Sequence, residues 1–74
     1  MDQRDLRYFE TIAELQHVGR AAEKLHRTQP ALTSSIRRLE EDCGAPLFER
    51  AGRGIRLTPA GRVLLKWAQR VRFD

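Results

Sequence analysis

The segment that most constrains the fold of this chain is residues 20–40, RAAEKLHRTQPALTSSIRRLE. It predicts a short helix, a tight turn and a second helix. Thr28 offers a hydroxyl near the start of the second helix, and Pro30 lies in its first turn, where a missing N–H costs nothing. Ala21 and Ala22 are small enough to let two helices cross closely. The pattern is typical of a helix-turn-helix, a unit that places its second helix in the DNA major groove.

The second of these helices should span about residues 29–42 and stop at Gly44. Helical spacing predicts a buried stripe made of Leu32, Ile36, Leu39 and Cys43. The opposite face then carries Pro30, Ser34, Arg37 and Arg38, with Thr33 beside them. Acidic residues 40–42 would be repelled by phosphate, so the N-terminal half of the helix should be the part that approaches a nucleic acid.

A first helix is expected over about residues 4–15, with a start signal in Asp2 followed three residues later by Asp5. Its apolar residues form two stripes, which suit packing on its own domain and on a second subunit; they are Leu6, Phe9 and Ala13, and Tyr8, Ile12 and Leu15. Gly19 should separate this helix from the short helix that contains Ala21, Ala22 and Leu25.

Beyond Pro46 the periodicity changes. Residues 47–50 and 55–57 predict two short strands, and the connection places Arg53 between two glycines, as in the wing of a winged helix. Thr58 and Pro59 then begin another helix, expected over residues 59–73. Its apolar residues recur at heptad-like steps and predict a dimer interface made of Ala60, Leu64, Trp67 and Val71. The predicted fold is mainly α with a small β-hairpin: a winged helix-turn-helix over residues 1–58, followed by the start of a linker helix over 59–74.

Charge supports a polyanionic partner. Residues 1–26 hold 4 Lys and Arg against 5 Asp and Glu, whereas residues 27–74 hold 10 against 5. The excess of +4 therefore lies in the half that contains the groove-reading elements. No apolar run approaches the ~20 residues of a membrane-spanning helix, and the N-terminus lacks the pattern of a signal peptide. With one cysteine, Cys43, an internal disulfide and a cysteine-based zinc site are excluded, and we expect a small buried thiol and no metal site.

The chain resembles the N-terminal DNA-binding domain of LysR-type bacterial transcriptional regulators. The resemblance covers nearly the whole chain, in the family's order and spacing. It is carried by DLRYF at 5–9, RAAEKL at 20–25, TQPAL at 28–32, IRRLE at 36–40, PLFER at 46–50 and LTPAG at 57–61.

This resemblance implies a cytoplasmic, nucleoid-associated regulator that binds double-stranded DNA. It implies a homodimer formed through the linker helix, which would bind an interrupted inverted repeat. It further implies a C-terminal domain outside this sequence that binds a small-molecule effector, and tetramers that repress or activate promoters. No cofactor is expected in the fragment itself.

The chain departs from the family pattern at several positions. Gly19 stands where a Ser or Thr helix cap is usual, and Arg27 replaces a usually apolar turn residue. Thr33 and Ser34 replace the more usual Ser followed by a larger polar or basic residue, so base preference cannot be copied from relatives. Cys43 replaces a common leucine.

The expected DNA contacts are Arg27, Thr28, Gln29, Pro30, Thr33, Ser34, Arg37, Arg38, Arg50 and Arg53. Gln29 can pair with adenine, and Pro30 and Thr33 can contact a thymine methyl. The simpler interpretation is that residues 28–30 only start a helix, although the two roles are compatible. Arg37 or Arg38 would hold phosphate, and Arg53 would enter a minor groove. Arg50 could equally pair with an internal acid, and Trp67 could equally belong to the core.

Two other functions remain open from sequence. One is an RNA-binding or nucleoid-coating module without sequence selectivity, and the other is a helical module that binds an acidic protein surface. An enzyme is not expected, because no paired carboxylates, nucleophile with a base, or phosphate-cradling loop is present.

Overall fold

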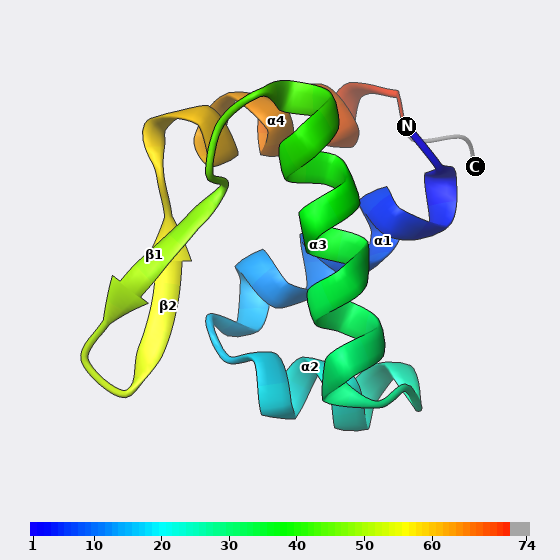
Figure 1. The fold of residues 1–74 in the computed structure, drawn as a ribbon, viewed down its shortest axis with the longest axis vertical. Coiled ribbons are helices and arrows are strands. Elements are labelled where there is room, and N and C mark those ends of the chain that lie inside the picture. Colours follow the sequence, from blue (N-terminus) through cyan, green and yellow to red (C-terminus); the bar gives the residue numbers. More distant parts are fainter. Residues whose placement is uncertain (72–74) are drawn as a thin grey trace.

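The chain folds into a winged helix-turn-helix, described by a computed structural model over residues 1–71 (Figure 1). This confirms the predicted fold class. In chain order the elements are α1 (Gln3–Leu15), α2 (Val18–Leu25), α3 (Gln29–Cys43), β1 (Phe48–Ala51), β2 (Gly54–Leu57) and α4 (Pro59–Arg70). In Figure 1, α3 stands upright in front of α1, the hairpin lies to its left, and α4 crosses the top.

Side-chain caps begin the helices where the sequence predicts them. The Asp2 carboxylate accepts a hydrogen bond from the backbone N–H of Arg4 at 2.7 Å, which starts α1. The hydroxyls of Thr28 and Thr58 cap α3 and α4 in the same way, at 3.3 and 3.1 Å. Each cap satisfies a backbone N–H that has no partner within its helix, so these residues set where each helix begins.

The start of α2 differs from the prediction. His17, not Gly19, caps this helix, and its Nδ1 accepts from the backbone N–H of Arg20 at 3.1 Å. Gln16 has already ended α1 in the left-handed conformation, with a φ of 53°. Because the chain turns at Gln16, Gly19 is not needed as a break and lies within the first turn of α2.

The core consists of two adjacent clusters that share α1 and α3. Phe9 is completely buried, and its ring lies 5.3 Å from that of Phe48, centroid to centroid. The first cluster contains Leu6, Phe9, Leu39, Leu47, Leu64 and Ala68. The second contains Tyr8, Ile12, Ala21, Ala22 and Leu32. Both clusters join residues far apart in the sequence, and both include side chains of α1 and α3.

The buried stripe of α3 is turned relative to the prediction. Leu32, Ser35 and Leu39 are fully buried, whereas Ile36 is half-buried and Cys43 is exposed. The prediction of a buried cysteine is therefore wrong. Cys43 is exposed because it is the last residue of α3, whereas Ser35 joins the buried side because its hydroxyl donates to Asp5 of α1.

The hairpin is fastened to the helices at its tip and at its base. β1 and β2 are antiparallel and pair Phe48 with Leu57. Near the tip, the backbone N–H of Ile55 donates to the carbonyl of Gln16 at 3.1 Å. A Cβ at Gly54 would meet that carbonyl, so this close approach requires glycine. Gly54, the second glycine beside Arg53, therefore allows the hairpin to contact the turn between α1 and α2.

Helix α4 packs on the base of the hairpin through Gly61, where a Cβ would meet the carbonyl of Leu47. Its inner face adds Leu64 and Ala68 to the core. Among residues 1–71, no helix combines the length and apolar character needed to cross a membrane.

Candidate nucleic-acid interface

The N-terminal half of α3 presents a continuous polar face to solvent. Its exposed residues are Gln29, Pro30, Thr33, Ser34 and Arg37. The side chains are short except at Gln29 and Arg37, so another molecule can come close to the helix backbone. Arg37 forms no hydrogen bond or ion pair within residues 1–71, which leaves its guanidinium free for an external anion. This matches the face that helical spacing predicts.

The beginning of α3 is arranged around Gln29. Thr28 uses its hydroxyl as an acceptor in the helix cap, while the exposed Gln29 side chain extends toward the start of α2. A Cβ at Gly19 would lie 3.3 Å from Gln29 Nε2 and 3.0 Å from His17 Cε1. The glycine therefore leaves the room that the glutamine amide occupies.

Arg27 lies in the turn between α2 and α3, where its guanidinium carbon is 6.0 Å from the centroid of the Tyr8 ring. At this distance the cation is attracted by the face of the aromatic ring. The side chain is nevertheless exposed, so its outer N–H groups remain available to a phosphate.

The hairpin carries two further arginines without an internal partner. Arg53 lies at the exposed turn beside Gly52, whose φ is +58°, and Arg50 is exposed on β1. Neither forms an ion pair within residues 1–71. The sequence left open whether Arg50 pairs with an internal acid. The neighbouring acid, Glu49, accepts instead from Arg56 across the hairpin at 3.0 Å.

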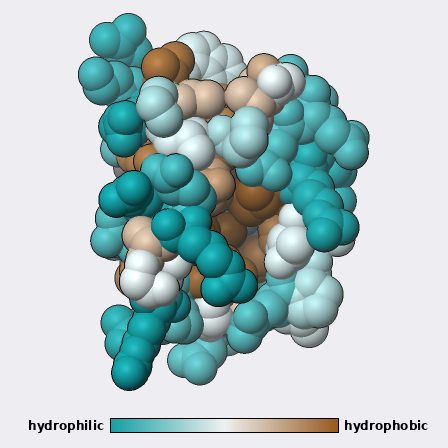
Figure 2. Space-filling model, turned by 60° about the vertical axis from the view of Figure 1, so that its left-hand side comes forward, coloured by the Kyte–Doolittle hydropathy of each residue, from teal (hydrophilic) through white to brown (hydrophobic). Residues whose placement is uncertain are grey.

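A hollow separates α3 from the hairpin, and Figure 2 shows apolar atoms at its floor with polar side chains around the rim. It encloses about 200 Å³. Two hydrogen bonds fasten the hairpin at the ends of this hollow, from the Ile55 N–H to the Gln16 carbonyl and from the Leu47 N–H to Glu40 Oε2 at 2.8 Å. Its lining residues are Ile12, Val18, Leu32, Thr33, Ile36, Arg37, Glu40, Phe48 and Ile55.

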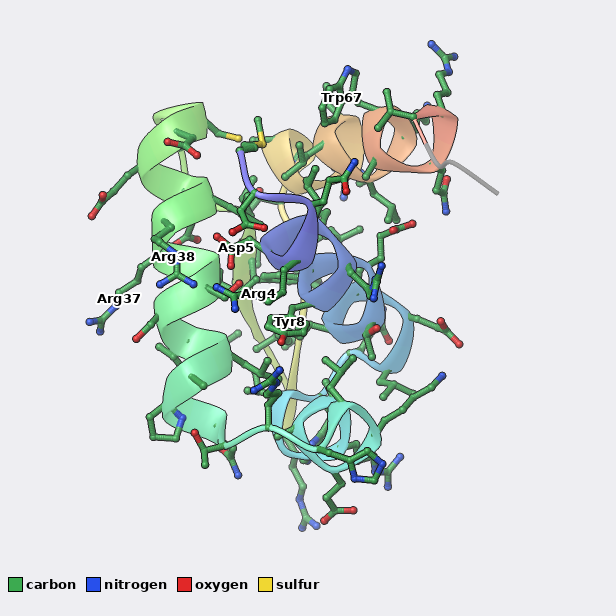
Figure 3. The ribbon with its side chains drawn as sticks, turned by 90° about the vertical axis from the view of Figure 1, so that its right-hand side faces the viewer. Arg4, Asp5, Tyr8, Arg37, Arg38 and Trp67 are labelled. Carbon is green, nitrogen blue, oxygen red and sulfur yellow. The ribbon has the colours of Figure 1, made fainter. Side chains whose placement is uncertain are left out.

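Arg38 differs from Arg37 because it is held by a buried carboxylate. Asp5 of α1 is 2% exposed and accepts from Arg38 Nε at 3.0 Å and Nη2 at 2.9 Å (Figure 3). It also accepts from the Ser35 hydroxyl at 2.6 Å. The hydrogen bond from Arg38 holds the pKa of the Asp5 carboxyl below its ordinary value of 3.8, against burial, which raises it.

The sequence analysis assigned Asp5 only to the start of the first helix and missed its contact with Ser35 and Arg38. A signal was present, because Asp5 lies three residues before Tyr8 and seven before Ile12, which places a carboxylate within an apolar stripe of α1. A carboxylate buried there needs a cationic or hydroxyl partner. Only the tertiary structure identifies these partners, 30 and 33 residues away.

Of the four residues of α4 that were expected at a dimer interface, only Trp67 is exposed in this domain. Leu64 is 6% exposed and belongs to the domain's own core, and Ala60 packs against that core. Both face inward because α4 lies across α1 and the hairpin base. Trp67 is 46% exposed, Val71 is half-buried, and the outer face also carries Val63 at 70%.

A groove of about 390 Å³ runs between α1 and α4 beside Trp67. Leu6, Ala68 and Val71 form apolar parts of its wall, and Arg7 and Glu10 add charged groups. The exposed indole and this groove form one surface, which we call the α1–α4 surface.

Comparison with known proteins assigns the chain and its fold to one family. The family described as "Bacterial regulatory helix-turn-helix protein, lysR family" matches residues 3–62. An uncharacterised HTH-type transcriptional regulator of Bacillus subtilis, YybE, is 49% identical over 69 residues, which are 93% of this chain and 24% of YybE. The regulator TfdT of Cupriavidus pinatubonensis is 48% identical over 71 residues, 96% of this chain and 31% of TfdT. The chain thus spans about a quarter to a third of the length of these relatives.

Solved structures agree. The crystal structure of CbnR, a LysR family transcriptional regulator, superposes with a TM-score of 0.90 at 44% identity, over 96% of this chain and 25% of CbnR. A complex of the CbnR DNA-binding domain with DNA gives the same score and identity, over 96% of this chain and 82% of that one. The BenM DNA-binding domain bound to catB site 1 DNA gives a TM-score of 0.88 at 39% identity, over 96% and 79%. The chain belongs to the LysR family of bacterial helix-turn-helix transcriptional regulators.

Proposed function

We propose that this chain is the DNA-reading domain of a transcriptional regulator, with α3 in a major groove and the hairpin over the adjacent backbone and minor groove. The proposal depends mainly on one observation, that the N-terminal end of α3 and the hairpin turn lie at the same edge of the molecule. The N-terminal end of α3 and the hairpin turn both lie at the lower end in Figure 1. That edge combines short polar side chains with Arg37 and Arg53, which have no hydrogen-bonded or ion-pair partner among residues 1–71.

The residues divide by chemistry. Thr33 and Ser34 are short and suit direct contact with base edges, and the Gln29 amide can donate to and accept from adenine. The arginines of α3 and the hairpin suit phosphate, which fixes position but not sequence. Two solved relatives, the CbnR and BenM domains, are described as complexes with DNA.

For the longer protein we propose the organisation that its relatives suggest. The linker helix beginning at Pro59 would pair two copies on an interrupted inverted repeat, and a C-terminal domain would bind a small-molecule effector. Tetramers would then repress or activate promoters in the cytoplasm. The division of the chain after residue 58 is part of this proposal, although α4 shares the core of the preceding domain.

The first test separates base reading from backbone contact. Thr33→Ala or Ser34→Ala is expected to weaken the operator complex by about 1–3 kcal/mol while leaving random duplex almost unchanged. Arg37→Ala should weaken all duplexes alike and make the salt dependence shallower by about one unit. Fluorescence anisotropy at several salt concentrations measures both, with an operator located by genomic footprinting of the full-length protein.

Ala31→Ser is a matched control, because Ala31 is exposed on α3 but outside the predicted contacts. If Thr33→Ala, Ser34→Ala and Arg37→Ala each lost equal affinity on operator and random duplex, the division between base contacts and backbone contacts would be contradicted.

A competition experiment tests the selectivity of the chain, with unrelated duplex and RNA as competitors at fixed salt. Equal competition by them would favour a non-selective nucleic-acid coat over an operator-reading domain.

The second test concerns the hairpin. The Arg53 guanidinium is expected to enter the minor groove beside the α3 site, where narrow A·T-rich sequence has the most negative potential. Arg53→Ala should therefore reduce the preference for A·T-rich flanks that α3 does not touch. Titration of one operator with A·T-rich and G·C-rich flanks checks this, with Arg56→Ala as a control since Arg56 is paired with Glu49. If the wild-type chain is indifferent to flanking composition, Arg53 does not have this role.

A further inference from the structure

The contact between Asp5, Ser35 and Arg38 ties α1 to α3. Asp5 and Ser35 are the buried polar residues within residues 1–71, and each has its hydrogen bonds satisfied by this contact. The Arg38 guanidinium meets the carboxylate side-on, through Nε and Nη2. Such two-point pairing fixes the plane of the guanidinium as well as its position.

The pairing with Asp5 leaves part of the hydrogen-bonding capacity of Arg38 unused. A guanidinium has five N–H donors, of which Asp5 occupies one on Nε and one on Nη2. The Arg38 side chain is 53% exposed, so its remaining donors face solvent. Figure 3, viewed from the side opposite the hairpin, shows Arg38 beside Asp5 while Arg37 extends freely away from α3.

The position of Arg38 complements that of the hairpin. A helix in a major groove has a phosphate backbone on each side, since the groove is about 12 Å wide. The hairpin lies on one side of α3, and Arg38 lies on the other. An arginine already ordered by Asp5 loses little further side-chain freedom when it binds a phosphate.

We propose that Asp5 is a positioning residue for DNA binding, which holds Arg38 so that its free N–H edge contacts the phosphate backbone on the side of α3 away from the hairpin. This inference rests on the proposed DNA-binding function. It goes beyond that proposal because Asp5 is buried and acidic and cannot touch DNA. We nevertheless expect Asp5 to raise the affinity for DNA.

The charge of Asp5 separates two explanations. A purely structural role and a positioning role predict changes of opposite sign in the affinity of Asp5→Asn for DNA. If Asp5 served only the fold, removing its negative charge would strengthen attraction to phosphate, and Asp5→Asn would bind as tightly as wild type or more tightly. If Asp5 positions Arg38, Asp5→Asn binds more weakly. The amide still offers one acceptor to Ser35 but cannot receive both N–H groups of the guanidinium.

The experiment measures anisotropy of this chain on operator and random duplexes at 50–200 mM salt, with the folded fraction of each variant checked by circular dichroism. We expect Arg38→Ala to lose about tenfold in affinity on both duplexes, with a salt slope shallower by about 0.9. Asp5→Asn should lose about fivefold on both duplexes. In the Arg38→Ala background, Asp5→Asn should cause no further loss.

Three further variants separate the positioning of Arg38 from effects on protein stability and on net charge. Asp42→Asn removes one exposed carboxylate from the end of α3 and should leave affinity unchanged or slightly raised. Ser35→Ala deletes the 2.6 Å hydrogen bond to the same carboxylate but leaves Arg38 paired, so it should lower stability more than affinity. Arg38→Lys keeps the charge without two-point pairing. It should lose most of the affinity lost by Arg38→Ala, even if Asp5→Asn fails to fold.

The proposal is overturned if Asp5→Asn or Arg38→Lys binds as tightly as wild type, or if Ser35→Ala loses as much affinity as Asp5→Asn. Failure of the wild-type chain to bind either duplex would instead refute the proposed function.

Discussion

Replacing Trp67 with alanine is expected to lower the affinity for a paired operator about a hundredfold, while binding to an isolated half-site stays nearly unchanged. The reason is linkage between two copies. If the α1–α4 surface joins them, binding of the first recognition helix brings the second to its half-site at high effective concentration, which is worth about 10²–10⁴ in affinity. Trp67, 46% exposed next to the groove, is the large aromatic side chain available for such a contact.

Titrations with full and half operators, together with sedimentation at graded protein concentrations, measure the Trp67 effect. Two recognition helices should face successive major grooves about 34 Å apart, so the half-sites should be spaced accordingly. Lys66→Ala is the matched control, since Lys66 is the exposed neighbour outside the groove. A Trp67→Ala chain that still binds the full site cooperatively would place the interface elsewhere.

Replacing Phe9 with alanine is expected to remove a large part of the chain's free energy of unfolding. Phe9 is 0% exposed and packs against Phe48, at the place where α1 meets the hairpin. Removing a buried phenylalanine costs about 3–5 kcal/mol. At about 0.05–0.15 kcal/mol per residue, the 74-residue chain has only about 4–11 kcal/mol of stability to lose.

Thermal and urea unfolding followed by circular dichroism measure the loss of stability in Phe9→Ala. Val63→Ala is the matched control, because Val63 is 70% exposed and should change the free energy of unfolding by less than about 0.5 kcal/mol. A Phe9→Ala variant that loses under about 1 kcal/mol would mean that the core repacks around the missing ring.

Helix-start chemistry and helical spacing were predicted correctly at several places where the deciding groups are neighbours in the sequence, although the cap at His17 was not. Thr28 and Thr58 cap helices because a hydroxyl meets an N–H three residues later. The outward face containing Thr33, Ser34 and Arg37 follows from the period of 3.6 residues. The hairpin follows from turn residues between two short apolar runs. Such features depend on residues close together in the chain.

The errors occurred where distant contacts compete with local pattern. Leu64 was assigned to a dimer interface because it fits a heptad, yet α4 lies on the hairpin base and buries it in the core. Cys43 was assigned to the buried stripe, but it lies exposed at the C-terminal end of α3, and Ser35 is buried instead. Spacing along a helix defines its faces, but only the position of neighbouring elements decides which face is covered.

Sequence alone therefore determined the order of the elements, the polar face of α3 and membership of a regulator family, because each depends on residues close together in the chain. The tertiary structure decided which of two neighbouring arginines on α3 is held by a carboxylate. Arg37 and Arg38 are adjacent and identical in type, yet only Arg38 lies within reach of Asp5, at 2.9 Å. The physical reason is the desolvation of that carboxylate. Once α1 packs against α3, a buried negative charge must be paired, and the partner 33 residues away in sequence is the one that the fold brings to it.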